Sequence, residues 1–105
     1  MEESVRGRSS RRRYVVAYDI RDDKRLRKVH KTMKEFGWSM QYSVFISDLD
    51  VMELIELKLR LASVLDHDCD SVAMIDVGLP TERGRSAFEF LGVAPVLPTA
   101  GATVI

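Results

Sequence analysis

Three aspartates follow one another closely where the most apolar segment of the chain ends. The run Tyr14–Tyr18 leads directly into Asp19, and Asp22 and Asp23 come soon after. A carboxylate at the end of a buried strand is an oxygen ligand of the kind that a hard cation such as Mg²⁺ prefers. A cation held there could activate water and offset phosphate charge during phosphodiester cleavage. The commoner alternative is that Asp19 is a solvated residue at the entry to a helix.

The two later aspartates are better explained by helix capping than by metal binding. Asp22 or Asp23 precedes a segment that runs to Phe36 with apolar residues at helical spacing, and Asp is a preferred N-cap. One chain therefore does not obviously bring two carboxylates together. A two-fold dimer would, because symmetry places the same patch of both subunits face to face. We therefore expect Asp19 to be half of a site that a second copy of the chain completes.

Other combinations of reactive residues are weaker. The segment around His67, residues 66–70, is rich in possible ligands but lacks paired Cys or His at ligand spacing. No glycine-rich phosphate loop is present in the sequence. Four aromatic residues could stack on nucleobases, although at strand positions such side chains more often belong to the core: Tyr18, Trp38, Tyr42 and Phe45.

Charge is divided unevenly along a chain whose total net charge is zero. Residues 1–34 carry a net charge of +7 and residues 35–105 one of −7. This asymmetry indicates an end of the molecule that faces nucleic acid. The alternative is a disordered basic tail that includes Arg11, Arg12 and Arg13, followed by a solvated helix face. The candidate nucleic-acid-binding residues are Arg21, Lys24, Arg25, Arg27, Lys28 and Lys31.

The elements that must position these residues follow from the apolar periodicity. We expect a strand at 12–20, a helix to Phe36, an extended block at 38–47, a helix at 51–65, a strand at 71–78 and a last strand at Ser86–Leu91. The second helix should bury Leu54, Ile55, Leu61, Ala62 and Leu65. If the extended block forms two strands, the order is βαββαβ plus one strand. That is an α+β, ferredoxin-like fold, with an antiparallel sheet and both helices on one face.

The chain is long enough for one such domain. We expect it at residues 12–92, between a flexible basic leader at 1–11 and a tail at 93–105 that could dock on another subunit. No run approaches the roughly 18 apolar residues of a membrane span, and the N-terminus lacks the apolar part of a secretory signal. We therefore expect no membrane contact and a cytoplasmic location.

Several segments, taken in order, are similar to those of a known family. YVVAYDI at 14–20, the DDKR that follows, QYSVF at 41–45, an acid-capped helix and DSV at 70–72 resemble the small CRISPR-associated spacer-acquisition proteins called Cas-two. One position departs from the family pattern. Many members have an arginine shortly before the QYSVF segment, where this chain has Ser39 or Met40. If that arginine holds phosphate, Arg21, Lys24 or Arg25 would have to replace it.

The resemblance implies a fold, an activity and partners. The fold is a ferredoxin-like homodimer whose C-terminal strand crosses onto the sheet of the partner, and here Ser86–Leu91 and the tail are the candidates. The activity is that of an Mg²⁺- or Mn²⁺-dependent endonuclease of RNA or double-stranded DNA, and the partner is the CRISPR integrase, whose dimers the protein bridges. Asp19 matches the proposed metal ligand of the family, and Tyr18, Ser43 and Phe45 match further catalytic positions.

Two other functions remain open for a chain of this pattern. The first is a catalytically silent adaptor that positions DNA for the integrase, which the basic helix face and the tail both suit. The second is a toxin-type ribonuclease or a small ligand-sensing module of the same fold. The genes next to this one would separate the CRISPR functions from the others.

Overall fold

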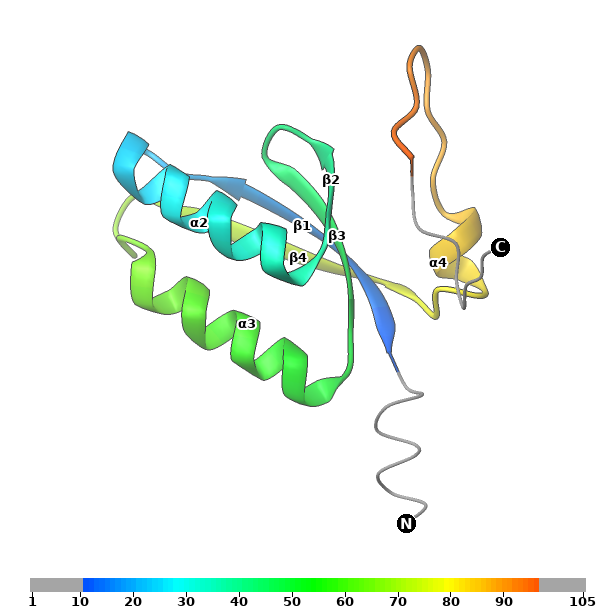
Figure 1. Cartoon of the computed structure of the whole chain (residues 1–105), viewed down its shortest axis with the longest axis horizontal. Helices are drawn as coiled ribbons and strands as arrows, with labels where there is room; N and C mark the ends of the chain where they lie inside the picture. The colour runs from blue at the N-terminus through cyan, green and yellow to red at the C-terminus, as the bar shows by residue number, and fades with distance from the viewer. Residues whose placement is uncertain (1–10, 97–105) are drawn as a thin grey trace.

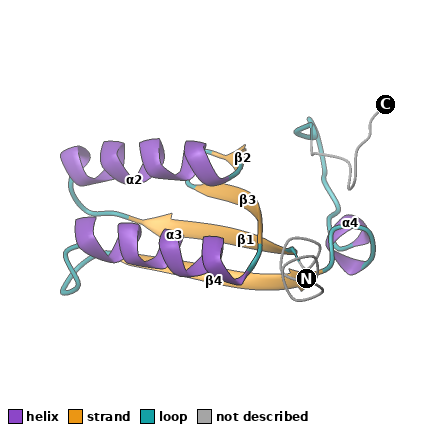
Figure 2. Ribbon diagram, turned by 60° about the horizontal axis from the view of Figure 1, so that its bottom comes forward, coloured by secondary structure: helices purple, strands orange, loops and turns teal. Residues whose placement is uncertain are grey.

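Two helices lie on one face of a four-stranded antiparallel sheet (Figure 1, Figure 2). The computed structural model describes residues 11–96. Its elements, in order, are β1 (Arg12–Asp19), α2 (Asp23–Phe36), β2 (Trp38–Gln41), β3 (Val44–Leu49), α3 (Val51–Val64), β4 (Ser71–Gly78) and α4 (Arg83–Ser86). The predicted α+β class is confirmed, and the extended block is two strands joined by a turn at 42–43.

β1 is a central strand, as its apolar run predicted. The strand order is β2-β3-β1-β4, so β1 has a neighbour on each edge. Val16 lies opposite Phe45 on one side and Met74 on the other. Both pairings are antiparallel, which gives the sheet the order of a ferredoxin-like fold.

The face of the sheet opposite the helices is largely uncovered (Figure 2). Successive side chains of a strand point to opposite faces, and Val16 and Tyr18 belong to the core under the helices. Val15, Ala17 and Asp19 therefore point the other way. Among the residues in register beside Val15 and Ala17, Ile46 on β3 is fully buried. The others complete an apolar surface, the uncovered sheet face, which consists of Val15, Ala17, Val44, Ala73 and Ile75.

Both long helices begin at the predicted caps. The Asp22 carboxylate accepts the backbone N–H of Arg25 at 3.0 Å. Asp50 and Glu53 form a full capping box, in which each side chain accepts the backbone N–H of the other residue at 2.9 Å. Capping of this kind satisfies N–H groups that have no partner inside the helix. None of the described helices is long and apolar enough to cross a membrane.

Gly37 ends α2, but not for the expected reason. Glycine usually ends a helix in the left-handed conformation, whereas Gly37 has φ −173°, which is extended backbone that any residue adopts. A Cβ at this position would instead overlap the backbone carbonyl oxygen of Ile46 on β3. The glycine is needed because β3 passes so close to the end of the helix.

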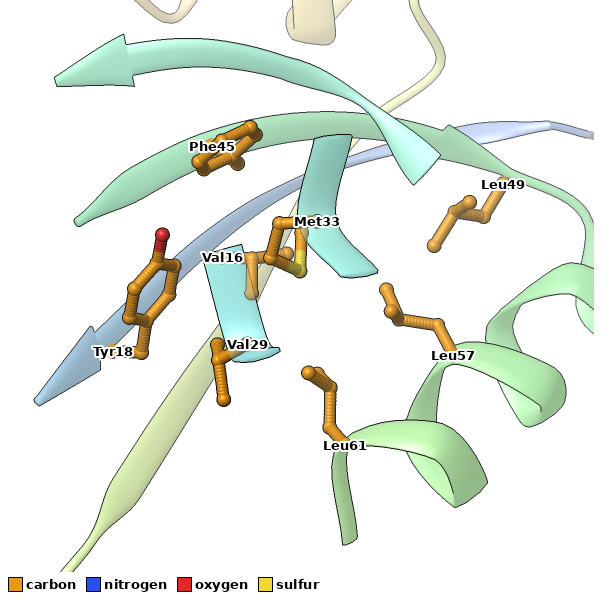
Figure 3. Close-up of a cluster of buried hydrophobic side chains, with 8 residues drawn as sticks. All are labelled: Val16, Tyr18, Val29, Met33, Phe45, Leu49, Leu57 and Leu61. Carbon is orange, nitrogen blue, oxygen red and sulfur yellow. The ribbon is translucent and has the colours of Figure 1, made fainter. Parts of the chain in front are cut away.

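The core lies between the sheet and the two helices (Figure 3). The sheet contributes Val16, Tyr18, Phe45 and Leu49, and the helices contribute Val29, Met33, Leu57 and Leu61, all of them buried. On α3 the prediction was partly wrong, because Ile55 and Ala62 are exposed while Leu57 is buried. Leucines surround this helix on several sides, so apolar spacing alone did not fix which stripe faces the sheet.

The predicted last strand at Ser86–Leu91 is absent from this chain. Ser86 is the final residue of α4, and residues 87–96 have no regular structure. They leave the body of the molecule as an extended arm (orange in Figure 1), so they meet no strand with which to pair. Leu91, Val93 and Val96 on this arm are almost fully exposed. The rest of the predicted tail, residues 97–105, lies outside the described residues, as does the leader at 1–10.

The alternative of a disordered basic tail is wrong for Arg11, Arg12 and Arg13, and the last two lie in β1, as the predicted strand at 12–20 requires. Arg11 forms an ion pair with Glu53 at 2.8 Å, and Arg12 forms one with Asp76 at 2.8 Å. The Arg13 side chain is only 2% exposed and makes two contacts with the Asp48 carboxylate, at 2.7 and 2.8 Å. Its Nη1 also donates to the carbonyl oxygen of Gly84 at 3.3 Å. These arginines join β1 to β3, α3, β4 and α4.

Candidate functional site

Asp19 lies at the end of β1, where the chain turns toward α2. Its side chain is 69% exposed, and its two carboxylate oxygens lie 3.2 and 3.3 Å from Nη1 of Arg21. By strand alternation it belongs to the same side of the sheet as Val15 and Ala17. An exposed carboxylate at the margin of an apolar surface is open to a ligand or to a second molecule.

The neighbouring aspartates do not add ligands to Asp19. Asp22 caps α2, and Asp23 lies in the first turn of the helix. Within residues 11–96, no three His, Cys, Asp or Glu side chains gather closely enough to hold a metal ion. The residues of one chain thus fit half of a divalent cation site at most, because Asp19 supplies one exposed carboxylate. The remaining ligands would have to come from a second copy or from solvent.

Asp70 holds the turn between β1 and α2 in place, and sequence analysis gave it no role. Its buried carboxylate accepts the backbone N–H of Arg21 at 2.8 Å, the backbone N–H of Asp66 at 2.9 Å and Nε of Arg25 at 2.7 Å. The Arg25 guanidinium and these N–H groups hold the pKa of Asp70 well below its usual range. The only signal in the sequence was its place in the DSV segment.

Two predicted nucleic-acid-binding residues form ion pairs within the protein. Arg25 is paired with Asp70, and this contact raises the pKa of the Arg25 guanidinium. Arg21 is paired with Asp19, but 62% of its side chain is exposed. Arg25 therefore serves mainly to position the turn, whereas Arg21 stays accessible beside the candidate metal ligand.

The other three predicted catalytic residues lie behind Asp19. The rings of Tyr18 and Phe45 are buried, with centroids 6.3 Å apart. Ser43 is half-buried in the turn before β3, and its carbonyl oxygen accepts the backbone N–H of Tyr18 at 3.0 Å. In one chain these three residues fix the strand end that carries Asp19, and a direct contact with substrate stays a prediction.

Most of the free positive charge of the described residues lies on α2. Lys24, Arg27, Lys28 and Lys31 are exposed, and within the described part of the chain none of them forms an ion pair. Lys34 belongs to the same set, although sequence analysis did not include it among the candidates. The candidate interface for nucleic acid is therefore narrower than the basic N-terminal part of the sequence, and it follows one helix.

Comparison with known sequences points to one family. A sequence model of the family described as CRISPR associated protein Cas2 matches residues 12–83, a range that contains every segment on which the resemblance rested. The CRISPR-associated endoribonuclease Cas2 1 of Rhodospirillum rubrum is 48% identical over 81 residues, which make up 77% of this chain and 78% of that protein.

Solved structures agree with the sequence comparison. The hypothetical protein TT1823 of Thermus thermophilus has a TM-score of 0.70 and 36% identity, and the match covers 82% of this chain and 96% of that one. Streptococcus pyogenes Cas2 has a TM-score of 0.68 and 29% identity, over 76% of this chain and 99% of that one. At these identities the likeness extends beyond the fold to the family.

Proposed function

The chain belongs to the CRISPR-associated protein Cas2 family, and from that premise we propose that it acts as a homodimeric, metal-dependent endonuclease in CRISPR adaptation. Its substrate is RNA or double-stranded DNA, and its dimer bridges two integrase dimers during spacer acquisition. The observation that carries the nuclease proposal is the exposed Asp19 carboxylate at the end of the central strand, beside the uncovered sheet face.

The uncovered sheet face supports the homodimer. Apolar surface left in water is unfavourable, and Ile75, on the edge strand of this face, is 53% exposed. A two-fold contact through this face would remove it from water and use the same residues in both copies. It would also bring the β1 strands together, and with them the two Asp19 carboxylates. The dimer thereby completes the half site that one chain provides.

The two Asp19 side chains would hold the divalent cation. When bound, Mg²⁺ or Mn²⁺ supplies activation of water and charge stabilisation at the phosphate. The protein itself orients the carboxylate, because Asp70 fixes the backbone of Arg21 two residues later. Arg21, exposed beside Asp19, offers a guanidinium that can bind a phosphate oxygen of the substrate.

Replacement of Asp19 by asparagine tests the proposal. We expect Asp19→Asn to lower the rate of cleavage of RNA or duplex DNA by more than about 100-fold, since loss of groups that merely support metal ligands already costs roughly 10–100-fold. Cleavage by the wild type should require added Mg²⁺ and stop with EDTA. Asp23→Asn is the matched control, because Asp23 is an exposed carboxylate in the first turn of α2, and it should cleave like the wild type.

Equal cleavage by the wild type and Asp19→Asn would contradict the catalytic role of Asp19 and point to a contaminating nuclease. Wild-type activity that persists in EDTA would contradict the metal dependence. Either result would leave membership of the family untouched.

A second candidate is the adaptor function, in which the dimer positions DNA without cutting it. The unpaired cations of α2 favour it, and so do the exposed apolar residues of the arm, which could dock on a partner protein. The same Asp19→Asn variant separates the two functions. Spacer acquisition that proceeds normally in cells with this variant would support the adaptor, whereas loss of acquisition would assign the essential step to the Asp19 site.

A further inference from the structure

A small cavity opens between α2 and the turn that joins β2 to β3. Its volume is about 220 Å³, and it is lined by Leu26, Arg27, His30, Lys31, Lys34 and Tyr42. Pockets for drug-sized ligands usually measure about 300–1,000 Å³, so this cavity suits a single ring system. Its walls combine aromatic rings with positive charge, a combination that the Asp19 site does not use.

Tyr42 presents an open ring surface at the rim of the cavity. The residue is 75% exposed, although large aromatic side chains generally gain from burial. Its ring packs against His30, with centroids 6.3 Å apart and planes inclined by 27°. An exposed ring that is already oriented can stack on a ligand at a low cost in conformational entropy.

Buried groups of the core keep the His30 ring in place. Its Nδ1 lies 3.0 Å from the hydroxyl of Tyr18, and the edge of Phe45 packs against its ring with centroids 5.4 Å apart. A tyrosine hydroxyl is protonated at neutral pH, and burial raises the pKa of Tyr18 further. This contact is therefore made through the tyrosine proton or the imidazole proton. The rigid core thus supports the aromatic side of the cavity from behind.

The cationic side of the cavity comes from one stripe of α2. Arg27, Lys31 and Lys34 are spaced at i, i+4 and i+7, so they lie on the same side of the helix. Within residues 11–96 none of them is paired with a carboxylate. Like charges at i and i+4 destabilise a helix, and a bound anion would relieve that repulsion.

We propose that this cavity binds one unpaired nucleotide, with its base stacked on Tyr42 and its phosphate in contact with Arg27, Lys31 and Lys34. The inference rests on the proposed nucleic-acid function and adds a contact separate from Asp19. Bases inside a duplex are excluded, because both of their faces are already stacked. Base-on-aromatic stacking is a sequence-tolerant way to hold single strands. A free mononucleotide offers the same ring and phosphate as a nucleotide within a strand.

Binding of labelled oligo(dT), oligo(U) and a duplex of equal length, measured by fluorescence anisotropy, tests the inference. We expect Tyr42→Leu to weaken binding of the single strands about tenfold, the usual effect of losing one stacked base, and to leave duplex binding unchanged. Tyr42→Phe keeps the ring and should bind single strands like the wild type. Because Tyr42 is exposed, both variants should melt at the wild-type temperature.

A second pair of variants tests the phosphate contact. Lys34→Ala should weaken binding of single strands and reduce the slope of log affinity against log salt by about one, as expected for one lost phosphate contact. Lys58→Ala removes an exposed lysine of α3 outside the cavity and should change neither quantity. If UMP displaces the oligonucleotides, the cavity binds free nucleotides as well as nucleotides within a strand. If the complex persists in the presence of UMP, the cavity binds only nucleotides within a strand.

Wild-type affinity of Tyr42→Leu for both single strands would overturn the inference, even if the duplex still binds and the proposed function stands. Failure of the wild-type protein to bind any of the three probes would overturn the proposed function together with it. Stronger binding of oligo(U) than of oligo(dT), or the reverse, would identify RNA or DNA as the preferred source of the unpaired nucleotide.

Discussion

A single buried carboxylate, that of Asp70, keeps the turn after Asp19 in place. Besides the adjacent Cys69, its donors come from residues 21, 25 and 66, and no local sequence pattern connects the first two with Asp70. The capping role of Asp22 and the position of Asp19 at a strand end could be inferred, because each depends on neighbours in the chain. The role of Asp70 could not, since it depends on β4 lying beside β1. The same is true of Tyr42 and His30, whose contact requires the folded turn before β3.

Asp70 should make the stability of the protein depend on pH. The folded-state pKa of Asp70 is lowered, first by Arg25, so the stability that it adds is complete above the pKa of about 3.9 for an unfolded aspartate. It is lost as the pH falls below that value. We expect Asp70→Asn to unfold at lower urea concentration than the wild type at pH 7, and the difference between the two proteins to shrink between pH 4 and pH 2.

Asp23→Asn is the control for that measurement, because its exposed carboxylate has no comparable network and should leave the urea midpoint unchanged at each pH. Glu35, Glu53 and Asp76 also have lowered pKa values, through Arg60, Arg11 and Arg12. These three carboxylates are present in the wild type and in Asp70→Asn alike, so their effect on stability cancels when the two proteins are compared. A constant difference down to pH 2 would show that Asp70 does not titrate with folding.

The junction between α2 and β3 depends on the absence of a side chain at Gly37. We expect Gly37→Ala to lower the free energy of unfolding by about 1–3 kcal/mol, because the added methyl group overlaps the Ile46 carbonyl oxygen and either the helix or the strand must shift. Chemical denaturation measures this change. Lys28→Ala, on the exposed side of the same helix, should stay within about 0.5 kcal/mol of the wild type. If Gly37→Ala were as stable as the wild type, the end of α2 could move away from β3 without cost.

Most elements could be predicted because their signals are local. The caps at Asp22 and Asp50 and the apolar run of β1 fixed where the first two helices and the central strand begin. The orientation of α3 could not be predicted, because leucines on several sides left more than one apolar stripe. The strand predicted at Ser86–Leu91 does not form, and the reason is different. A strand requires a neighbour with free backbone groups, and residues 87–96 have none in a single chain.

At the scale of the whole molecule, apart from the arm, the described residues leave apolar side chains in water on the uncovered sheet face and on α3, and an isoleucine of similar exposure marks each. Ile75 is 53% exposed on the uncovered sheet face, and Ile55 is 46% exposed on α3. If the sheet faces pair in the dimer, Ile75→Lys places two lysines in the interface and should raise the dimer dissociation constant by more than about 100-fold. Ile55→Lys should leave the dimer intact. Sedimentation velocity over a range of concentrations measures both.

Both variants should keep the fold, because each side chain is half exposed in the single chain, and far-ultraviolet circular dichroism checks this. Dissociation by Ile55→Lys with an unaffected Ile75→Lys would place the interface on α3 and separate the two Asp19 residues. That outcome would contradict the shared cation site even if the protein is a dimer.

The ion pairs of the N-terminal arginines also set the order in which the chain can finish folding. Arg13 reaches Asp48 across 35 positions and Gly84 across 71. A ribosome adds about 5–20 residues per second, so Gly84 is made roughly 4–14 s after Arg13. Until then the Arg13 guanidinium, near the start of β1, lacks the Gly84 carbonyl oxygen as a partner. We therefore expect the burial of Arg13 to be completed late in synthesis, once α4 has been made.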